Sequence, residues 1–431
     1  MRRAIRAFST AALVLAATGA AAQTESDRAF LYDRVLGSLV GSAIGDAMGA
    51  PTEMWSRDQI QAEYGFVSDL HTAMRPPSPE GTWAMNVRAG ATTDDTRWKA
   101  LMVDYLTGTG GGVRARKPGL KAKDLAKLLS TRFTGEIEQL RKLSTDDPAT
   151  QLIDGVMRMQ WLQEWDRVAR AYLTADVDEY RTTLDQFYGG EMVCAGLLFS
   201  PTLGAYYPGD PEAAYLNTFA VDVYDLGYAR DVSSVTAAMV AAAMVPDATP
   251  ESILSVIADV DPHDYFETRL VGRLAYEMLR EARGIVHTAR KVEAAPAGPP
   301  PPALGSGSAV EIHPWANSGM SPQQRAQLEA AYLMLDAKMQ RMPFHAGEIH
   351  LVNLTALVYS DFDFPTALAF VVNWGRDNDT TAAVTGAVLG AYLGAEKLPP
   401  EWVKQSLEKN RGLGIDLEAL ADRLTTGILE R

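Results

Sequence analysis

The stretch that decides the fold is VNWGRDNDTTAAVTGAVLGAYLG, residues 372–394. Its second half has the apolar repeat of a helix, at every fourth position: Val384, Val388 and Tyr392. Glycines keep the same spacing near both ends of the chain: Gly37, Gly41, Gly45, Gly386, Gly390 and Gly394. A glycine costs a helix about 1 kcal/mol relative to alanine. The repeated spacing therefore predicts bare faces that other helices approach closely, rather than a mere Ala/Gly-rich composition.

Most of the chain outside this stretch also has helical periodicity. Apolar residues repeat at helical spacing in six further segments: 31–43, 98–105, 152–173, 232–244, 270–289 and 323–339. We find no series of alternating strand patterns, so the sequence predicts an all-α fold with many helices in a single domain. Of the 431 residues, 47% are hydrophobic and 22% are charged. These values exclude whole-chain disorder and a polytopic membrane protein.

Two segments interrupt the helical pattern. Residues 108–119 (GTGGGVRARKPG) are Gly-rich and contain the densest short basic patch. Residues 294–308 (AAPAGPPPPALGSGS) are Pro-rich and then Gly/Ser-rich, which is typical of an extended or flexible segment. The second segment can be interpreted as a domain linker. We favour a long surface insertion within one domain, because the helical pattern is the same on both sides.

The N-terminus has the three parts of a secretory signal peptide. They are a basic region with three arginines (residues 2–6), a short apolar core (11–17, AALVLAA) and a small-residue cleavage site (20–22, AAA). The core is too short for a membrane span, which takes about 20 residues. An uncleaved anchor or an ordinary helix is the alternative. We predict that residues 1–22 are removed and that the mature protein is periplasmic or secreted, without membrane attachment.

Charge and cysteine content narrow the possible functions. The chain has 40 Lys and Arg against 54 Asp and Glu, a net charge of −14. Such a surface repels phosphate backbones, so nucleic acid is not an expected partner. Cys194 is the single cysteine, which rules out an internal disulfide and a cysteine-based zinc cluster. It lies in an apolar run, and we interpret it as a small buried hydrophobe.

Two acidic clusters near opposite ends of the chain are the strongest functional signal. Thr93-Asp94-Asp95-Thr96 and Asp377-Asn378-Asp379-Thr380 each come directly before a predicted helix. Taken singly, each cluster is explained by carboxylates that cap a helix start. Together they supply hard oxygen donors, which suit Mg²⁺, Mn²⁺ or Ca²⁺ rather than zinc. If the two helix starts meet in space, the carboxylates predict a two-metal site.

Two further segments contain polar groups of possible catalytic type. In GDAMGAPTE (45–53), Glu53 follows the first glycine-spaced helix, where its carboxylate can serve as a metal ligand or a general base. Alone it would be an ordinary loop acid. In HAGEIH (345–350), two histidines and a glutamate resemble a zinc cluster. Their spacing fits no common zinc motif, and we interpret them as the polar caps of a helix start.

Three stretches together resemble the ADP-ribosylglycohydrolase family, which includes the dinitrogenase-reductase-activating glycohydrolase. They are GSLVGSAIGDAMGAPTE (37–53), TTDDT (92–96) and the opening stretch (372–394), in the family's order. The resemblance implies an all-α fold over residues 27–431 and a site for two Mg²⁺ ions, with Mn²⁺ as an alternative. The ligands that it implies are Thr93, Asp94, Asp95, Asp377, Asp379 and Thr380. Glu53 matches the family's mobile active-site glutamate, and Asp46 matches an aspartate that we expect to support structure.

The resemblance also implies a reaction. The family cleaves the bond at C1 of an ADP-ribosyl ribose, which corresponds to a hydrolase of the EC 3.2.2 type. Such a bond breaks through an oxocarbenium-like transition state, and a metal-activated water with a carboxylate base suits it. We predict Glu53, Asp95 and Asp379 as the catalytic residues. The expected partner is an ADP-ribose-containing or other ribosyl small molecule, or a modified protein.

The chain departs from the family pattern around the substrate. Where many members have Gly-Gly-Asp-Thr-Asp-Thr, this chain has GRDNDT (375–380), which keeps the ligand positions. Arg376 is predicted either to hold a phosphate or to form a structural salt bridge, and Trp374 either to stack on a base or to pack. A Ser-Asn-Gly…Met-Arg segment of many members has lost its Asn and Arg within residues 189–201.

These departures leave three hypotheses open. The first is a metal-dependent hydrolase of ADP-ribosyl or related N- or O-ribosyl bonds. The second is a non-catalytic metal-binding or structural protein on the same scaffold, like the jellyfish lens crystallins that resemble this family. The third is a hydrolase of the same type that acts on a free riboside outside the cytoplasm. The intact ligand set favours an enzyme.

Overall fold

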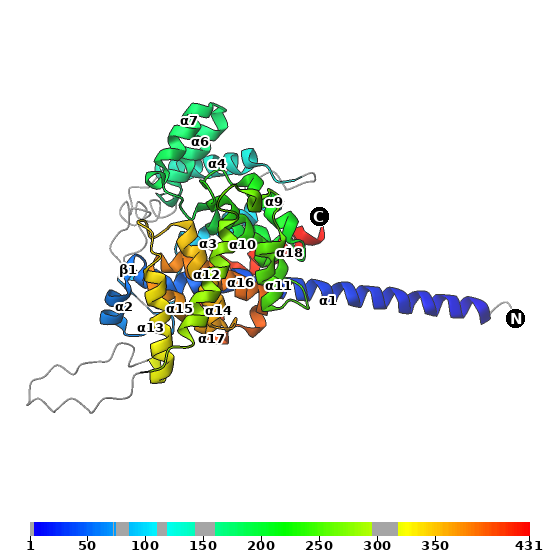
Figure 1. Ribbon diagram of the computed structural model, residues 1–431. Coiled ribbons are helices and arrows are strands. Elements are labelled where there is room, and N and C mark those ends of the chain that lie inside the picture. Colours follow the sequence, from blue (N-terminus) through cyan, green and yellow to red (C-terminus); the bar gives the residue numbers. More distant parts are fainter. Residues whose placement is uncertain (1–3, 72, 75–85, 110–118, 143–159, 295–317) are drawn as a thin grey trace, which may run out of the picture.

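The computed structural model describes all residues except 1–3, 72, 75–85, 110–118, 143–159 and 295–317. Within the described residues the chain is built almost wholly of helices (Figure 1). The strands there form two short antiparallel pairs: β1 (Trp55–Ser56) with β4 (Gly375–Arg376), and β2 (Ala73–Met74) with β3 (Asn86–Val87). The predicted all-α fold is confirmed.

The helices account for the periodic segments of the sequence within the described residues; positions 152–159 of the predicted segment 152–173 lie outside them. The predicted segments 98–105, 232–244, 270–289 and 323–339 fall largely within α3, α10, α12 and α13. In chain order the helices are α1 (Ala4–Gly49), α2 (Arg57–Tyr64), α3 (Asp94–Thr107), α4 (Ala122–Leu140), α6 (Gln163–Thr174), α7 (Val177–Gln186), α8 (Ala195–Ala205), α9 (Pro211–Val221), α10 (Ala229–Ala243), α11 (Pro250–Asp259), α12 (Leu274–Ala289), α13 (Pro322–Asp336), α14 (Ala346–Tyr359), α15 (Phe364–Trp374), α16 (Asn378–Leu393), α17 (Pro400–Gly412) and α18 (Leu417–Leu429).

Helices α1 and α16 form the centre of the fold and pack along their glycine faces. A Cβ atom built on Gly390 would overlap the carbonyl oxygen of Gly37, and one on Gly386 would overlap that of Gly41. Backbone therefore lies directly against backbone, which only glycine permits. The predicted bare faces are confirmed for Gly37, Gly41, Gly386 and Gly390, and these faces meet each other. Gly394 is instead the C-cap of α16 (φ 83°) and lies outside the helix.

Several other helices are buried on nearly every side. In α8, α14 and α16 almost all residues are buried, and α15 is buried from Ala367 to Trp374. A helix without a solvent-exposed face has no amphipathic repeat. This is why periodicity in the sequence singles out neither α8 nor α14.

Helix α1 begins at Ala4, and its N-terminal half extends away from the body of the molecule (Figure 1). Its side chains are described from Glu25 onward, so the predicted signal peptide (1–22) lies outside the described side chains and stays a prediction. Among the helices the structure describes, none is both long enough and apolar enough to cross a membrane. The predicted insertion (294–308) and the basic patch in 108–119 lie almost entirely outside the described residues.

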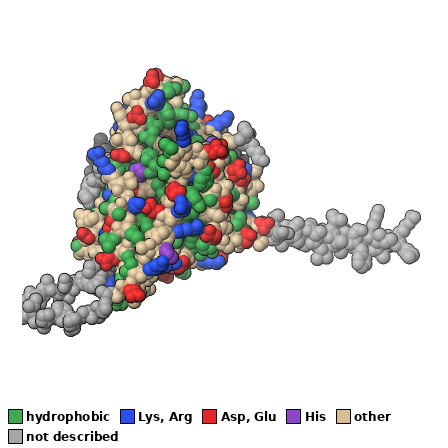
Figure 2. Space-filling view, viewed as in Figure 1, with side chains coloured by type: hydrophobic (Ala, Val, Ile, Leu, Met, Phe, Trp, Pro, Cys, Tyr) green, Lys and Arg blue, Asp and Glu red, His purple; other side chains and the backbone are tan. Residues whose placement is uncertain are grey.

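The surface carries both signs of charge. On the face seen in Figure 2, Lys and Arg side chains are interspersed with Asp and Glu side chains over the described residues. Proteins that bind phosphate backbones instead gather their basic side chains on one face. The visible face does not have that arrangement.

Candidate active site

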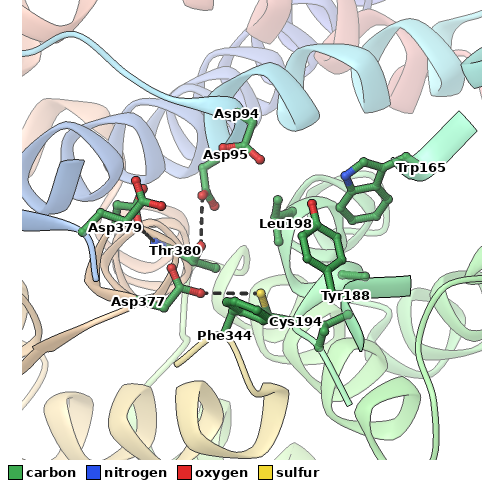
Figure 3. Close-up of a pocket in the computed structure, with 13 residues that line it drawn as sticks. Asp94, Asp95, Trp165, Tyr188, Cys194, Leu198, Phe344, Asp377, Asp379 and Thr380 are labelled. Atoms are coloured by element: carbon green, nitrogen blue, oxygen red, sulfur yellow. Dashed lines mark hydrogen bonds between the residues drawn. The ribbon is translucent and has the colours of Figure 1, made fainter. Parts of the chain in front are cut away.

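The two acidic clusters meet at one cavity (Figure 3). Asp94 and Asp95 open α3, Asp377 is the N-cap of α16, and Asp379 lies in the first turn of α16. All four carboxylates line the cavity, as do Glu53 and Thr380. The space between these residues that protein atoms do not fill is about 400 Å³, part of which is open to solvent. The starts of two helices that are far apart in the sequence therefore lie side by side.

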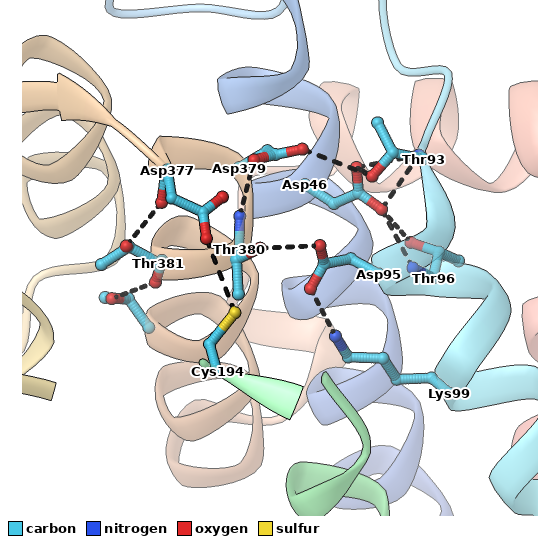
Figure 4. A network of polar contacts seen from close by, with 11 residues as sticks. Asp46, Thr93, Asp95, Thr96, Lys99, Cys194, Asp377, Asp379, Thr380 and Thr381 are labelled. Carbon is cyan, nitrogen blue, oxygen red and sulfur yellow. Dashed lines mark hydrogen bonds and ion pairs between the residues drawn. The ribbon is translucent and has the colours of Figure 1, made fainter. Parts of the chain in front are cut away.

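Asp46, on α1, holds the start of α3 in place (Figure 4). Its buried carboxylate accepts hydrogen bonds from the backbone N–H groups of Thr93 and Thr96, at 3.0 Å each. It also accepts hydrogen bonds from their hydroxyl groups, at 3.0 and 2.6 Å. The Thr93 side chain makes no cap hydrogen bond of its own. A carboxylate from another helix thus satisfies the N–H groups that a helix start leaves open.

Glu53 is tied to the second acidic cluster through the backbone. It directly follows the 3₁₀ turn Ala50–Thr52 that ends α1, and it is 8% exposed. The next residue, Met54, adopts a left-handed conformation (φ 65°), and its N–H donates to the carbonyl oxygen of Arg376 at 2.7 Å. Strand β1 then pairs with β4, which immediately precedes Asp377. These contacts place Glu53 beside the second cluster.

Threonine hydroxyl groups bridge the two clusters. Thr380 Oγ1 donates to Asp95 Oδ2 at 3.1 Å, and Thr93 Oγ1 lies 3.4 Å from Asp379 Oδ2 (Figure 4). Each bridge joins the start of α3 to the start of α16. The predicted ligand residues therefore belong to one connected network.

Two residues of the site were not recognised from the sequence. The ammonium of Lys99 lies 3.1 Å from Asp95 Oδ1, and both side chains are 2% exposed. Their spacing of four residues, which places two side chains on one helix face, was the available signal. Cys194 is buried, as predicted, but its Sγ donates to Asp377 Oδ2 at 3.6 Å and lines the cavity. It is part of the site wall as well as a small hydrophobe.

Burial and mutual repulsion favour the protonated form of these carboxyl groups. Burial, Glu53 and Asp95 together raise the pKa of Asp377 to about 7. Burial and the neighbouring Asp95 raise the pKa of Asp46 to about 6. The pKa of Asp94 lies well above its usual range, because of burial and the same acidic neighbours. Without added positive charge, the site therefore keeps protons up to near-neutral pH.

The metal-free protein is expected to lose stability as the pH rises from about 4 to about 7. A carboxyl group with a raised pKa holds its proton more tightly in the folded than in the unfolded chain. Its contribution to the free energy of unfolding is therefore complete below about pH 3.9, the unfolded pKa, and is lost as the pH rises through the folded pKa. Asp377 and Asp46 set the upper end of this window. Urea unfolding of chelator-treated protein across this range measures the effect. Asp377→Asn should flatten the dependence; an unchanged pH profile in this variant would contradict the assignment.

The carboxylates do not form a ready coordination cluster. Across the described residues, no group of three His, Cys, Asp or Glu side chains is arranged to hold a metal ion. The site carboxylates instead face protein donors: Asp95 faces Lys99 and Thr380, and Asp379 accepts the Thr380 N–H at 2.9 Å. The donor chemistry nevertheless suits a hard cation, since five carboxylates and a hydroxyl line one small cavity. A cation would have to displace protons and these donors.

Arg376 and Trp374 are held by protein partners and do not line the cavity. The Arg376 guanidinium donates to Glu348 through Nε at 2.7 Å and Nη2 at 2.9 Å. Trp374 is buried, and its Nε1–H donates to Asp336 Oδ1 at 3.1 Å. This placement supports the structural salt bridge for Arg376 and the packing role for Trp374. It does not support their prediction as substrate-binding residues.

The HAGEIH segment starts a helix, as predicted. His345 is the N-cap of α14, and its Nδ1 accepts the N–H of Gly347 at 3.1 Å. Glu348 is the partner of Arg376. His350 is fully buried in α14, and burial lowers its pKa to about 3. The three side chains thus have separate structural environments.

Comparison with known proteins agrees with this fold. A sequence profile of the ADP-ribosylglycohydrolase family matches residues 27–431, and the chain belongs to this family. A solved structure of an ADP-ribosylglycohydrolase-related protein complex shares the fold, with a TM-score of 0.52 at 18% identity over 92% of this chain and 98% of that one. Family membership supports a glycohydrolase of the ADP-ribosyl type.

Individual relatives match over short segments. The uncharacterized protein YegU of Escherichia coli (strain K12) is 35% identical over 74 residues, 17% of this chain and 21% of YegU. The ADP-ribosyl-[dinitrogen reductase] glycohydrolase of Rhodospirillum rubrum is 32% identical over 80 residues, 19% of this chain and 24% of that enzyme. The matched segments thus span less than a quarter of either relative.

Proposed function

We propose that this protein is a metal-dependent hydrolase of the bond at C1 of a ribosyl group, of the ADP-ribosyl or a related type. The observation that carries the proposal is the convergence of five carboxylates, from three distant segments, on one cavity. Helix capping does not explain them, because the N-caps of α3 and α16 make no side-chain cap hydrogen bond. Family membership supports the same class of reaction.

The site residues are suited to Mg²⁺ or Mn²⁺. Five carboxylates line the cavity. Two divalent ions would balance four of their negative charges, and the ammonium of Lys99 balances the fifth, on Asp95. When bound, the ions would orient ribose hydroxyl groups and lower the pKa of water. The residues that would hold them are Thr93, Asp94, Asp95, Asp377, Asp379 and Thr380.

The carboxylates have distinct roles in the proposed reaction. Glu53 comes from a loop rather than a helix start, and we assign it as the base that takes a proton from the attacking water. Asp95 is fixed by Lys99 and Thr380, and Asp379 by the backbone N–H of Thr380. Their negative charge stabilises the positive charge that develops on the ribose as the bond at C1 breaks.

Metal binding is the first property to measure. Calorimetric titration of the chelator-treated mature protein with Mg²⁺ and Mn²⁺ should give two equivalents per chain, followed by metal-dependent hydrolysis of a ribosyl compound. A folded protein that binds neither ion would refute the proposal. It would favour the non-catalytic scaffold, in which the carboxylates are structural.

We also propose that residues 1–22 direct export, so that the enzyme acts in the periplasm or outside the cell. The basic, apolar and small-residue parts of this segment support the proposal. Sequencing the N-terminus of the protein recovered from an expressing bacterium tests it. Cleavage after Ala22 is the expected result, and an intact N-terminus on cytoplasmic protein would refute it.

A further inference from the structure

The active-site cavity has two unlike walls (Figure 3). Carboxylates form one wall. The opposite wall is apolar and largely aromatic, and its members include Trp165, Tyr188, Val193, Leu198 and Phe344. Among the residues the structure describes, no Lys, Arg or His lines the cavity. The diphosphate of an ADP-ribosyl group carries two negative charges, which proteins usually hold with such cations.

Helix N-termini can also bind phosphate, but those at this cavity are occupied by the protein's own carboxylates. Asp46 accepts the N–H groups at the start of α3. Asp379 accepts one at the start of α16. At the start of α8, the buried Asp225 accepts the Gly196 N–H at 2.9 Å, and a side chain on Gly196 would collide with Asp225 and Asp222. A further anion there would meet negative charge.

The aromatic wall is closely packed. Trp165 packs against Trp98 and Tyr224, with ring centroids 4.3 and 4.8 Å away. Tyr188 adopts a left-handed conformation (φ 45°), which costs a non-glycine residue about 1–3 kcal/mol and persists mainly where function uses it. Its ring packs edge-on against Phe344 at 5.6 Å. Such a wall is suited to a flat, uncharged ring.

One donor in this wall has no acceptor. The Nε1–H of Trp165 is buried, and the described residues offer it no hydrogen-bond partner. In Figure 3 the nitrogen lies on the ring edge that is turned toward Asp94 and Asp95. A buried donor without a hydrogen-bond partner is energetically unfavourable, so an acceptor atom on a bound ligand would supply the missing hydrogen bond.

From this wall we infer that the substrate is an unphosphorylated riboside whose leaving group is a flat heteroaromatic base, as in a nucleoside, rather than an ADP-ribosyl group. The inference rests on the proposed function and names its substrate class. The ribose would lie against the carboxylates and the base against the aromatic wall.

The reaction is a hydrolysis that needs only water. The oxygen of water forms a bond to C1, and Glu53 takes the proton that this oxygen releases. The C1–N bond breaks, and its electron pair leaves with the base, which then takes up a proton. The Trp165 N–H would donate to a ring nitrogen or carbonyl of the base and stabilise the charge that builds up there. The products are free ribose and the free base.

Replacing Trp165 by phenylalanine separates the indole N–H from the aromatic ring. With Mg²⁺ present, Trp165→Phe should lower kcat/KM for purine nucleosides roughly 10- to 100-fold. Trp98→Phe is the matched control, because Trp98 also has a buried N–H without a described partner but does not line the cavity. It should lower kcat/KM clearly less than Trp165→Phe does, since it alters the packing behind Trp165 but removes no donor from the cavity. Equal losses in the two variants would overturn the role of Trp165.

A substrate panel separates this inference from the proposed function. Purine and pyrimidine nucleosides, ADP-ribosylated arginine and an ADP-ribosylated protein are incubated with the metal-loaded full chain, and released base or reducing sugar is measured. Hydrolysis of nucleosides at least about 10-fold faster, the effect of about 1.4 kcal/mol, supports the inference. Faster hydrolysis of the ADP-ribosyl compounds overturns it and leaves the proposed function intact. Hydrolysis of neither class overturns both.

Cys194 supplies a readout that does not depend on activity. It is the single cysteine of the chain and lines the cavity, so its alkylation reports occupancy. A purine nucleoside with Mg²⁺ should slow alkylation by iodoacetamide, and Trp165→Phe should weaken this protection where Trp98→Phe does not. Protection by ADP-ribose but by no nucleoside would overturn the inference.

Discussion

Replacing Gly386 by alanine is expected to prevent folding or to lower the free energy of unfolding by at least about 3 kcal/mol. The added Cβ would overlap the carbonyl oxygen of Gly41, which is backbone and cannot rotate away. Helices α1 and α16 would have to separate where both are fully buried. Alanine favours a helix by about 1 kcal/mol over glycine, which does not offset this cost. Urea unfolding, or the soluble fraction if the variant aggregates, measures the effect.

Gly284→Ala is the matched control for this prediction. Gly284 lies within α12, and a Cβ built there meets no atom within 4 Å. The same substitution should be neutral or should stabilise the protein by up to about 1 kcal/mol. If both alanine variants were equally stable, the close packing of α1 on α16 would be refuted.

Asp94→Asn and Asp377→Asn are each expected to remove metal binding and to lower the hydrolysis rate by roughly 10³-fold, because each removes a ligand of the proposed ions, which would supply several kcal/mol of transition-state stabilisation. Neither should destabilise the metal-free protein. Burial and neighbouring carboxylates raise the pKa of both groups, so their removal relieves repulsion. Calorimetric metal titration and urea unfolding of the same preparations measure the two effects.

Asp104→Asn, farther along α3, should show the opposite pattern. Asp104 forms ion pairs with Arg132 and Arg423 at 2.8 and 2.9 Å and does not line the active-site cavity. Its loss should reduce stability modestly, by about 1 kcal/mol or less for partly exposed pairs, and leave metal binding intact. If Asp94→Asn lowered the stability as Asp104→Asn does and still bound Mg²⁺ or Mn²⁺, the assignment of the acidic clusters as metal ligands would be wrong, and they would be helix caps.

The sequence predicts those features that follow from local spacing. Glycines four apart imply a bare helix face whatever that face packs against, and the glycines from Gly37 to Gly45 and Gly386 with Gly390 lie where α1 and α16 pack backbone to backbone. Two Asp-rich clusters, each directly before a helical repeat, place carboxylates at helix starts. From the resemblance to the family, we expect these two clusters and Glu53 to form one site.

Other features depend on contacts between distant residues. Helix α8 escapes prediction, and α14 is predicted only at its start, because both are buried on nearly all sides and so have no polar face. Arg376 and Glu348 lie in separate segments, and nothing local shows that they pair at 2.7 Å. From the sequence, Cys194 is interpreted only as a buried hydrophobe. Its contact with Asp377 arises because the start of α8 packs near the start of α16, which no local pattern indicates.

The sequence by itself therefore determined the helical class, the glycine-faced helices and the acidic groups that meet at the site. Only the tertiary structure decided what faces those acids: Thr380 against Asp95, and a wall formed by Trp165, Tyr188 and Phe344. The physical reason is that periodicity reports which face of a helix is buried and not which partner buries it. Burial, charge repulsion and the choice of substrate all depend on that partner.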